Sequence, residues 1–127
     1  MKLELNRVKE WCEATEIKVE KEPSLIPEER FRLRFNLMGE ENTEYLEACV
    51  ANDKEQIADA LGDMLYILAG TALEHGMQDY MERVFLEIHR SNMSKMDENG
   101  KPIRREDGKI LKGPQYSKPN IKKIINP

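Results

Sequence analysis

Five acidic residues stand at spacings that could bring their carboxylates together. Glu40, Glu41 and Glu44 occupy a short acidic stretch, and Asp59 and Asp63 follow further along the chain. Residues three or four positions apart lie on the same face of an α-helix. Carboxylates that crowd together repel one another and lose hydration, which is unfavourable unless protons or cations neutralise them. The two groups therefore indicate a site for a divalent cation.

The chemistry of these ligands narrows the choice of ion. All of them offer oxygen atoms, which favours hard ions such as Mg²⁺, for which Mn²⁺ can substitute. Mg²⁺ held by a few carboxylates keeps positions for water and for substrate phosphates, so the implied substrate is a polyphosphate. Either acidic group alone would be more typical of a solvated helix surface. Together they favour a metal site, because each interrupts an otherwise apolar helix face.

Apolar periodicity and helix-boundary residues predict the elements that would position these side chains. The predicted helices cover about residues 2–16, Pro27–Val50, Lys54–Glu74 and Gln78–Ser94. Two turn signals, at residues 98–101 and 106–109, flank short apolar segments and predict a small hairpin or an ordered loop. We expect an all-α fold, a bundle of four to five helices with a basic C-terminal loop or hairpin tail.

The second and third predicted helices each carry an apolar stripe and an acidic side. The expected core stripes are Phe31, Phe35, Met38, Leu46 and Cys49 in the second helix, and Ile57, Leu61, Met64, Leu65, Leu68 and Ala72 in the third. The third helix has no charge from Met64 to Leu73, and Tyr66 and Gly70 share the side of Asp59 and Asp63. Both of its faces should be covered, by other helices or by a second subunit. We therefore expect a homodimer or a dimer of dimers.

Length and charge set the domain organisation. A chain of 127 residues fits a single domain, here residues 1–127, with a helical body over 1–95 and an extended tail over 96–127. The net charge of −4 conceals an asymmetry: residues 1–94 carry 11 basic and 20 acidic side chains, and residues 95–127 carry 9 and 4. An acidic body attracts cations and a basic tail attracts phosphate or the body itself, so no nucleic-acid partner is needed.

Cysteine usage and hydropathy exclude several classes of protein. Cys12 and Cys49 show neither a CxxC spacing nor a nearby histidine pair, so no zinc site or disulfide framework is indicated. The N-terminal stretch lacks the apolar core of a signal peptide, and Met64–Leu73 is too short to span a bilayer. We expect a reduced, cytoplasmic protein with no membrane partner.

Several segments of the sequence, taken together, resemble those of a known protein superfamily. Residues 37–44 (LMGEENTE) and 57–66 (IADALGDMLY) resemble the MazG-like and phosphoribosyl-ATP-pyrophosphohydrolase-like superfamily in order and helical placement. Residues 69–73 (AGTAL) with Gly76, residues 84–95 (VFLEIHRSNMSK) and residues 97–114 (DENGKPIRREDGKILKGP) resemble its branch related to dimeric dUTPases. The similarity covers residues from about 30 to 118.

This resemblance implies Mg²⁺-dependent hydrolysis of a nucleoside triphosphate, dUTP or a non-canonical nucleotide among the candidates, to the monophosphate and pyrophosphate. It implies that Glu40, Glu41, Glu44 and Asp63 bind metal and that Glu41 and Glu44 are catalytic, with Glu41 accepting a proton from the attacking water. The family pattern has an acid three residues before Asp63, where this chain has Ala60. Asp59, one residue earlier, lies on the same helix face and is the expected replacement.

The resemblance also suggests residues that contact substrate. Asn92 and Lys95 would bind phosphate oxygens, Tyr66 would contact substrate through its hydroxyl, and Arg104 and Lys112 of the tail would reach the triphosphate. Alternatively, Lys95 only ends a helix favourably, Tyr66 belongs to the core and the tail is solvated.

Three other functions stay open at this stage. One is hydrolysis of phosphoribosyl-ATP, the nearest rival within the superfamily. The others are a metal- or nucleotide-binding module without turnover and a helical dimerisation protein with acids as surface decoration. The base preference depends on pocket shape and a few hydrogen bonds, which the sequence does not reveal.

Overall fold

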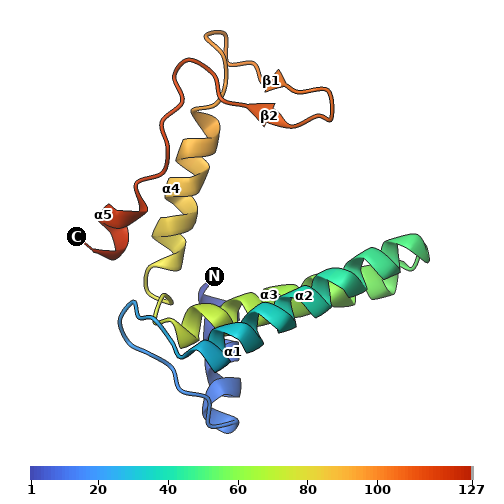
Figure 1. Cartoon of the computed structure of the whole chain (residues 1–127), viewed down its shortest axis with the longest axis vertical. Coiled ribbons are helices and arrows are strands. Elements are labelled where there is room, and N and C mark those ends of the chain that lie inside the picture. The colour runs from blue at the N-terminus through green and yellow to red at the C-terminus, as the bar shows by residue number, and fades with distance from the viewer. Residues whose placement is uncertain (127) are drawn as a thin grey trace. The chain divides into compact units, whose positions relative to one another are not determined.

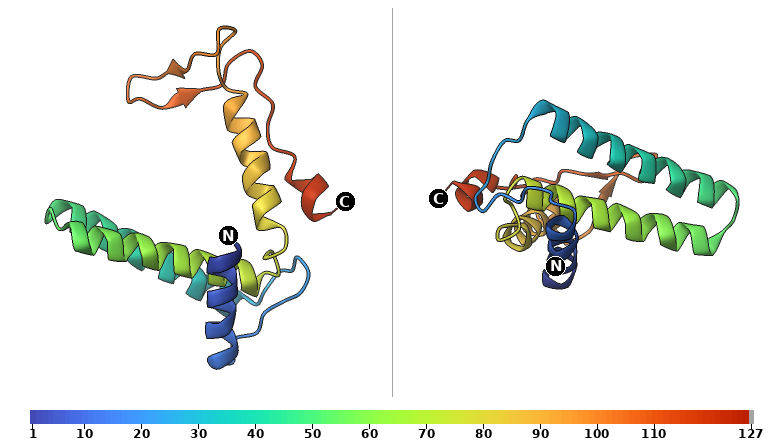
Figure 2. Two further views of the ribbon diagram at one scale, coloured as in Figure 1. Left: turned by 180° about the vertical axis from the view of Figure 1, so that it is seen from behind. Right: turned by 90° about the horizontal axis from the view of Figure 1, so that it is seen from below.

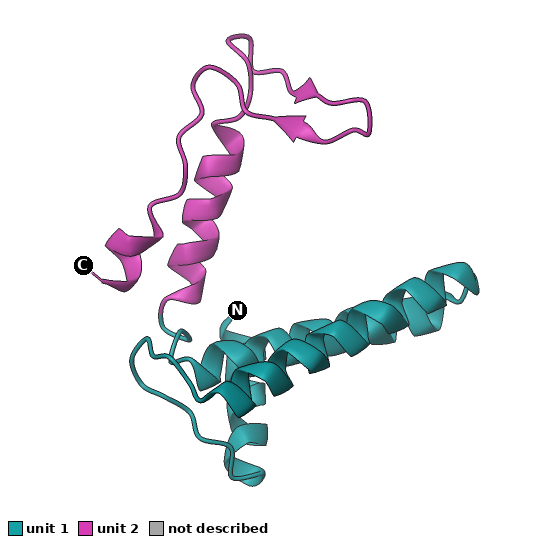
Figure 3. Ribbon diagram, viewed as in Figure 1, with its two compact units in different colours: residues 1–79 teal, residues 80–127 magenta. Residues whose placement is uncertain are grey.

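The computed structural model describes residues 1–126 and is mainly helical, which confirms the all-α prediction (Figure 1). The elements are α1 (Lys2–Ala14), α2 (Glu28–Val50), α3 (Lys54–Glu74), α4 (Met81–Met93), β1 (Ile103–Arg104), β2 (Ile110–Leu111) and α5 (Ile121–Ile125). The chain divides into two compact units, Met1–Asp79 and a second that begins at Tyr80 (Figure 3). The division precedes α4, whereas the sequence suggested a body that extends to residue 95.

The first unit is built on an antiparallel pair, α2 and α3, which lie side by side along their length (Figure 2). A tight turn joins them, with Asn52 at a φ of 54°. Asp53 then caps α3, because its carboxylate accepts a hydrogen bond of 3.1 Å from the backbone N–H of Gln56. The predicted start and end of α3 are thus confirmed, and the pair brings the acidic stretches onto neighbouring helices.

Helix α1 packs on α3 near the open end of the pair. Leu5, Val8 and Cys12 of α1 are buried there, together with Ala69 and Leu73 of α3. The contact joins apolar side chains of both helices, with Leu73 almost completely buried. The core of the unit consequently lies at this end, where the sequence has its longest uncharged run.

A buried ion pair ties α2 to α3 in the same region. Arg34 is 8% exposed and its guanidinium donates to the Thr71 hydroxyl and the Ile67 carbonyl, with Glu74 3.2 Å away. Arg30 also binds Glu74, at 2.8 Å. Gly70 makes room for this group, since a Cβ added there would lie 2.7 Å from Nη2 of Arg34. Hydrogen bonds to several partners offset the cost of burying these charges.

In the single chain, the predicted core stripes of α2 and α3 are only partly buried: Ala72 is buried, and the other members are half-buried or exposed. Phe35 and Leu46 of α2 are 71% and 61% exposed, and Leu61 of α3 is 51% exposed. The buried residues are Arg34 and Ala48 of α2 and small residues of α3 such as Ala60. Bulky apolar side chains of both helices are thus left at the surface of the single chain, which periodicity alone does not reveal.

The second unit consists of α4, a hairpin and α5. Strands β1 and β2 pair antiparallel with Ile103 opposite Leu111, which confirms the predicted hairpin. Gly108 adopts a positive φ of 89° in the turn between the strands, and Gly100 a positive φ of 73° in the turn before β1. Helix α5 contacts α4 and was not predicted as a separate element. No helix within residues 1–126 is long and apolar enough to cross a membrane.

Candidate functional site

Three of the predicted acidic residues come together on α2 and α3. One oxygen from each of Glu41, Glu44 and Asp63 lies within 4.8 Å of the others. Glu41 and Glu44 are three positions apart on α2, and the antiparallel pairing brings Asp63 of α3 opposite them. Glu44 is exposed, whereas Glu41 and Asp63 are partly buried. We call these three residues the acidic cluster.

Glu41 has the least favourable environment of the three. Its Oε2 atom is buried and has no hydrogen-bond partner within the described chain. The pKa of Glu41 is raised from 4.5 to about 7, most of all by burial, and also by a hydrogen bond with Glu44 and by the charges of Glu44, Asp63 and Asp59. A proton or a cation is therefore needed to stabilise this side chain near neutral pH.

The cluster fits a divalent cation in donor type and spacing. Its ligand atoms are all carboxylate oxygens, the type that Mg²⁺ and Mn²⁺ prefer. Two oxygens bound to one Mg²⁺ are at most about 4.2 Å apart, twice the usual bond length. Small side-chain movements would bring the three oxygens within that limit, and the exposed side at Glu44 leaves room for water or a phosphate ligand.

The structure leaves two predicted metal ligands outside the cluster. Asp59 is exposed and lies one turn before Asp63, and its charge acts on Glu41. Glu40 is exposed and next to Glu41 along α2. Both stay predictions, Asp59 as a further ligand on the α3 side and Glu40 as a further ligand on the α2 side.

The predicted substrate-binding residues fall in both units. Tyr66 lies on α3, one turn beyond Asp63, and is 42% exposed. Asn92 is exposed near the end of α4, and Lys95 follows it, with its backbone carbonyl bound by the N–H of Gly113 at 2.8 Å. In the hairpin region, exposed Arg104 lies in β1, and Nζ of Lys112 stands 4.8 Å from the centre of the Tyr116 ring. Their contacts with substrate stay predictions.

An apolar pocket next to the cluster was not predicted as a functional feature. It has a volume of about 220 Å³ and is lined by Met38, Met64, Leu65 and Leu68. Met38 lies one turn before Glu41, and Met64 directly follows Asp63. Sequence periodicity assigned these side chains to a closed core, so the opening of this face toward solvent had no signal in the sequence.

Comparison with known proteins places most of this architecture in one family. A family model described as phosphoribosyl-ATP pyrophosphohydrolase matches residues 8–92. The match includes α2, α3, the whole acidic cluster and most of α4. The hairpin and α5 lie beyond it. No curated protein matches the chain significantly.

Proposed function

The chain belongs to the phosphoribosyl-ATP pyrophosphohydrolase family, whose members are nucleotide pyrophosphohydrolases, and we propose that its substrate is a nucleoside triphosphate. The products would be the nucleoside monophosphate and pyrophosphate. The observation that carries this proposal is the acidic cluster of Glu41, Glu44 and Asp63, with the unpartnered oxygen of Glu41 inside it. Phosphoanhydride hydrolysis depends on the neutralisation of phosphate charge, which a cation bound at this cluster would supply.

Glu44 and Asp63 are the residues that would hold Mg²⁺, together with one oxygen of Glu41. A bound divalent ion neutralises charge that develops on phosphate oxygens and lowers the pKa of coordinated water. The second oxygen of Glu41 would accept the proton of the attacking water. That oxygen is buried and has no other hydrogen-bond partner in the described chain.

Water and the nucleotide are the only reactants that this step needs. Water oxygen bonds to one phosphorus of the anhydride between the α and β phosphates, and the bridging P–O bond breaks. One water proton moves to Glu41, and the bridging oxygen leaves with the other phosphate-bearing product. Tyr66 and the polar residues Asn92, Lys95, Arg104 and Lys112 would orient the substrate during this step.

Phosphoribosyl-ATP is the second candidate substrate, and the family match specifically favours it. It contains the same α–β phosphoanhydride, so the acidic cluster would act on it in the same way. Phosphoribosyl-ATP differs from ATP by the phosphoribosyl group on its adenine base, and from dUTP by the base and sugar as well. Nothing in the cluster itself distinguishes the candidates, because its three carboxylates would contact only the cation and phosphate region.

A second copy of the chain would cover the apolar side chains that α2 and α3 leave exposed. Phe35, Leu46 and Leu61 are each more than half exposed. The pocket between Met38, Met64, Leu65 and Leu68 lies on the same pair of helices. Monomeric proteins rarely expose apolar patches of this extent, so we expect a homodimer or a dimer of dimers.

The proposal is tested by product analysis on the purified protein. The protein is incubated with Mg²⁺ and a panel of nucleoside triphosphates that includes dUTP, and in parallel with phosphoribosyl-ATP. Glu44→Gln is the inactive variant, and Glu47→Gln on the same helix is the matched control, since Glu47 is exposed and outside the cluster.

Monophosphate and pyrophosphate from the triphosphates, lost in Glu44→Gln and retained in Glu47→Gln, would support the proposal and rank the bases. Turnover of phosphoribosyl-ATP alone would favour the second candidate. Orthophosphate as the product, or no turnover of any substrate, would overturn the mechanism and favour a binding module.

A further inference from the structure

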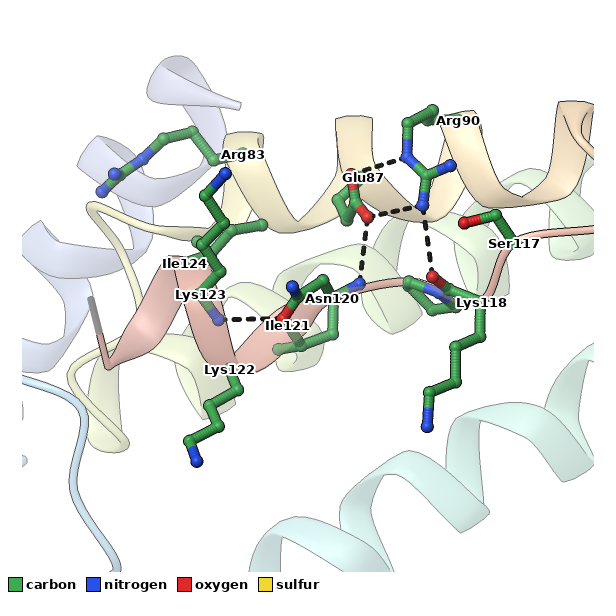
Figure 4. A pocket seen from close by; sticks show the side chains of 11 residues that line it. Arg83, Glu87, Arg90, Ser117, Lys118, Asn120, Ile121, Lys122, Lys123 and Ile124 are labelled. Atoms are coloured by element: carbon green, nitrogen blue, oxygen red, sulfur yellow. Dashed lines mark hydrogen bonds and ion pairs between the residues drawn. The ribbon is translucent and has the colours of Figure 1, made fainter.

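The second unit contains a hollow between α4 and the C-terminal segment that the catalytic proposal does not use. It has a volume of about 1130 Å³ and is lined by α4 and by residues 117–124 (Figure 4). Five of its lining residues are basic: Arg83, Arg90, Lys118, Lys122 and Lys123. We call it the basic pocket. Most of it lies beyond the part of the chain that matches the family.

Among the described residues, the one acidic side chain that lines the basic pocket is already neutralised. Glu87 binds Arg90 through two hydrogen bonds of 2.7 and 3.0 Å and accepts a third, of 2.9 Å, from the backbone N–H of Asn120. The hydrogen bond from Arg90 and that from Asn120 lower the pKa of Glu87 to about 2. Glu87 therefore stays ionised and fixes Arg90, and it has little capacity left to balance the lysines.

Two of the lysines that line the basic pocket are free to bind an anion. Within residues 1–126, Nζ of Lys118 and Nζ of Lys122 form no hydrogen bond or ion pair, and both side chains extend to the same side of the C-terminal segment (Figure 4). Arg90 also donates a hydrogen bond of 3.2 Å to the carbonyl of Lys118, which ties this segment to α4. Like charges held around one hollow raise a positive potential there, which attracts anions.

We propose that the basic pocket binds a small anion with two or more linked phosphate groups, such as pyrophosphate or the triphosphate of a nucleotide. Lys118, Lys122 and Lys123 would supply the charge, and Arg90, oriented by Glu87, would supply directional donors. The volume is sufficient for a ligand of nucleotide size.

A small anion fits the basic pocket better than a nucleic acid does. The part of its lining that the structure describes has no aromatic side chain on which a base could stack, and Ile121, Ile124 and Pro119 form the apolar part. The cations line one hollow and do not form a long stripe of the kind that follows a nucleic-acid backbone.

Binding is measured by calorimetric titration of the full chain with sodium pyrophosphate, tripolyphosphate and a nucleoside triphosphate in excess EDTA. EDTA removes divalent ions, so the acidic cluster contributes nothing to the signal, and failure of the proposed catalysis would not affect the result. Tighter binding of the nucleoside triphosphate than of tripolyphosphate would show that the base and sugar also contact the pocket.

The variant Lys118→Gln/Lys122→Gln should weaken binding by at least about tenfold, the equivalent of losing roughly 1.4 kcal/mol. The matched control is Lys9→Gln/Lys21→Gln, which removes the same net charge from two exposed lysines of the first unit and should bind normally. In the unmutated chain, the NMR chemical shifts of backbone amides at residues 83–90 and 117–124 should change when pyrophosphate is added. This test does not depend on whether the variant folds.

Three results would overturn the proposal. They are no saturable binding of any of these anions, equal weakening in both double variants, and amide shifts confined to residues outside the basic pocket. Affinity that grows with the length of an added oligonucleotide and exceeds that for tripolyphosphate would instead assign the surface to nucleic acid.

Discussion

Glu41 is the side chain of the candidate site whose surroundings most favour binding a proton or a cation. One of its oxygens is shielded from water without a partner in the described chain, and three further carboxylates act on it through their charges. Its pKa is raised to about 7, so protons and metal ions compete for it in the physiological range. The same environment that makes Glu41 costly to ionise makes it effective for holding a cation.

Glu41→Gln should raise the thermal stability of the metal-free protein at pH 8. A carboxyl group whose pKa is raised by folding contributes its stability fully below its unfolded pKa, near 4.5, and loses it as the pH rises through about 7. The amide removes this loss, so Tm should increase by a few degrees at pH 8, on the order expected for about 1 kcal/mol. The difference should vanish at pH 4, below the unfolded pKa.

Thermal melts of the wild type, Glu41→Gln and Glu47→Gln in EDTA at both pH values check this prediction. Glu47→Gln serves as the control, since it removes an exposed carboxylate from the same helix. A lower Tm for Glu41→Gln at pH 8 would contradict the prediction, because it would mean that the Glu41 carboxylate stabilises the metal-free fold.

At the scale of elements, the pairing of α2 with α3 positions the cluster, and Arg34 anchors that pairing. Arg34→Ala should destabilise the protein by about 3 kcal/mol, because the buried Glu74 keeps only its pair with Arg30 and the hydrogen bonds from the Arg34 guanidinium to α3 are lost. Arg32→Ala is the matched control. Its pair with Glu28 is exposed and should contribute no more than about 1 kcal/mol. Urea unfolding of both variants measures the difference, and similar losses in the two would contradict this role of Arg34.

The contact between α4 and the C-terminal segment should depend on Glu87. Folding lowers the pKa of Glu87 to about 2, so its contribution is present above the unfolded value near 4.5 and is lost as the pH falls through about 2. Glu87→Gln should remove this dependence and speed amide exchange at Asn120, whose N–H binds the carboxylate. Exchange rates at Asn120 that are equal in the wild type and the variant would argue against this contact.

Helix boundaries could be predicted from the sequence because local residues determine them. Pro27 precedes α2, Asp53 caps α3, and Gly76 at a φ of 70° follows its end. The buried faces could not be predicted in the same way. Periodicity favoured Phe35 and Leu46, but which side of a helix is covered depends on how closely its neighbour approaches. The short α5 was missed, although Asn120 before an Ile-rich stretch is a capping signal.

The sequence predicted which types of residue form the candidate site, but only partly which of these residues come together. Helical spacing indicated two acidic groups, and the structure brings Glu41, Glu44 and Asp63 together. Glu40 and Asp59 are exposed and lie outside this set, Glu40 beside Glu41 and Asp59 one turn before Asp63. Which carboxylates meet depends on how the two helices pack and is not encoded in either helix alone.

At the scale of the whole molecule, each unit leaves apolar side chains exposed. Phe35 and Leu46 in the first unit and Phe85 and Leu86 in the second are all more than half exposed. Light scattering during size-exclusion chromatography should therefore give the mass of a dimer or of a dimer of dimers. Phe35→Ser should shift the protein toward the monomer, whereas Leu25→Ser, at a fully solvated linker position, should not. A monomeric wild type at micromolar concentration would contradict this prediction.

The central claim is that the acidic cluster binds a divalent cation. Its most direct test is a titration of the metal-free protein with Mn²⁺, in which electron paramagnetic resonance measures the free ion. The acidic cluster predicts saturable binding that Glu44→Gln and Asp63→Asn each weaken by at least about tenfold and that Glu47→Gln leaves unchanged. Binding that is equally strong in all four proteins, or absent from the wild type, would show that Glu41, Glu44 and Asp63 do not form a metal site.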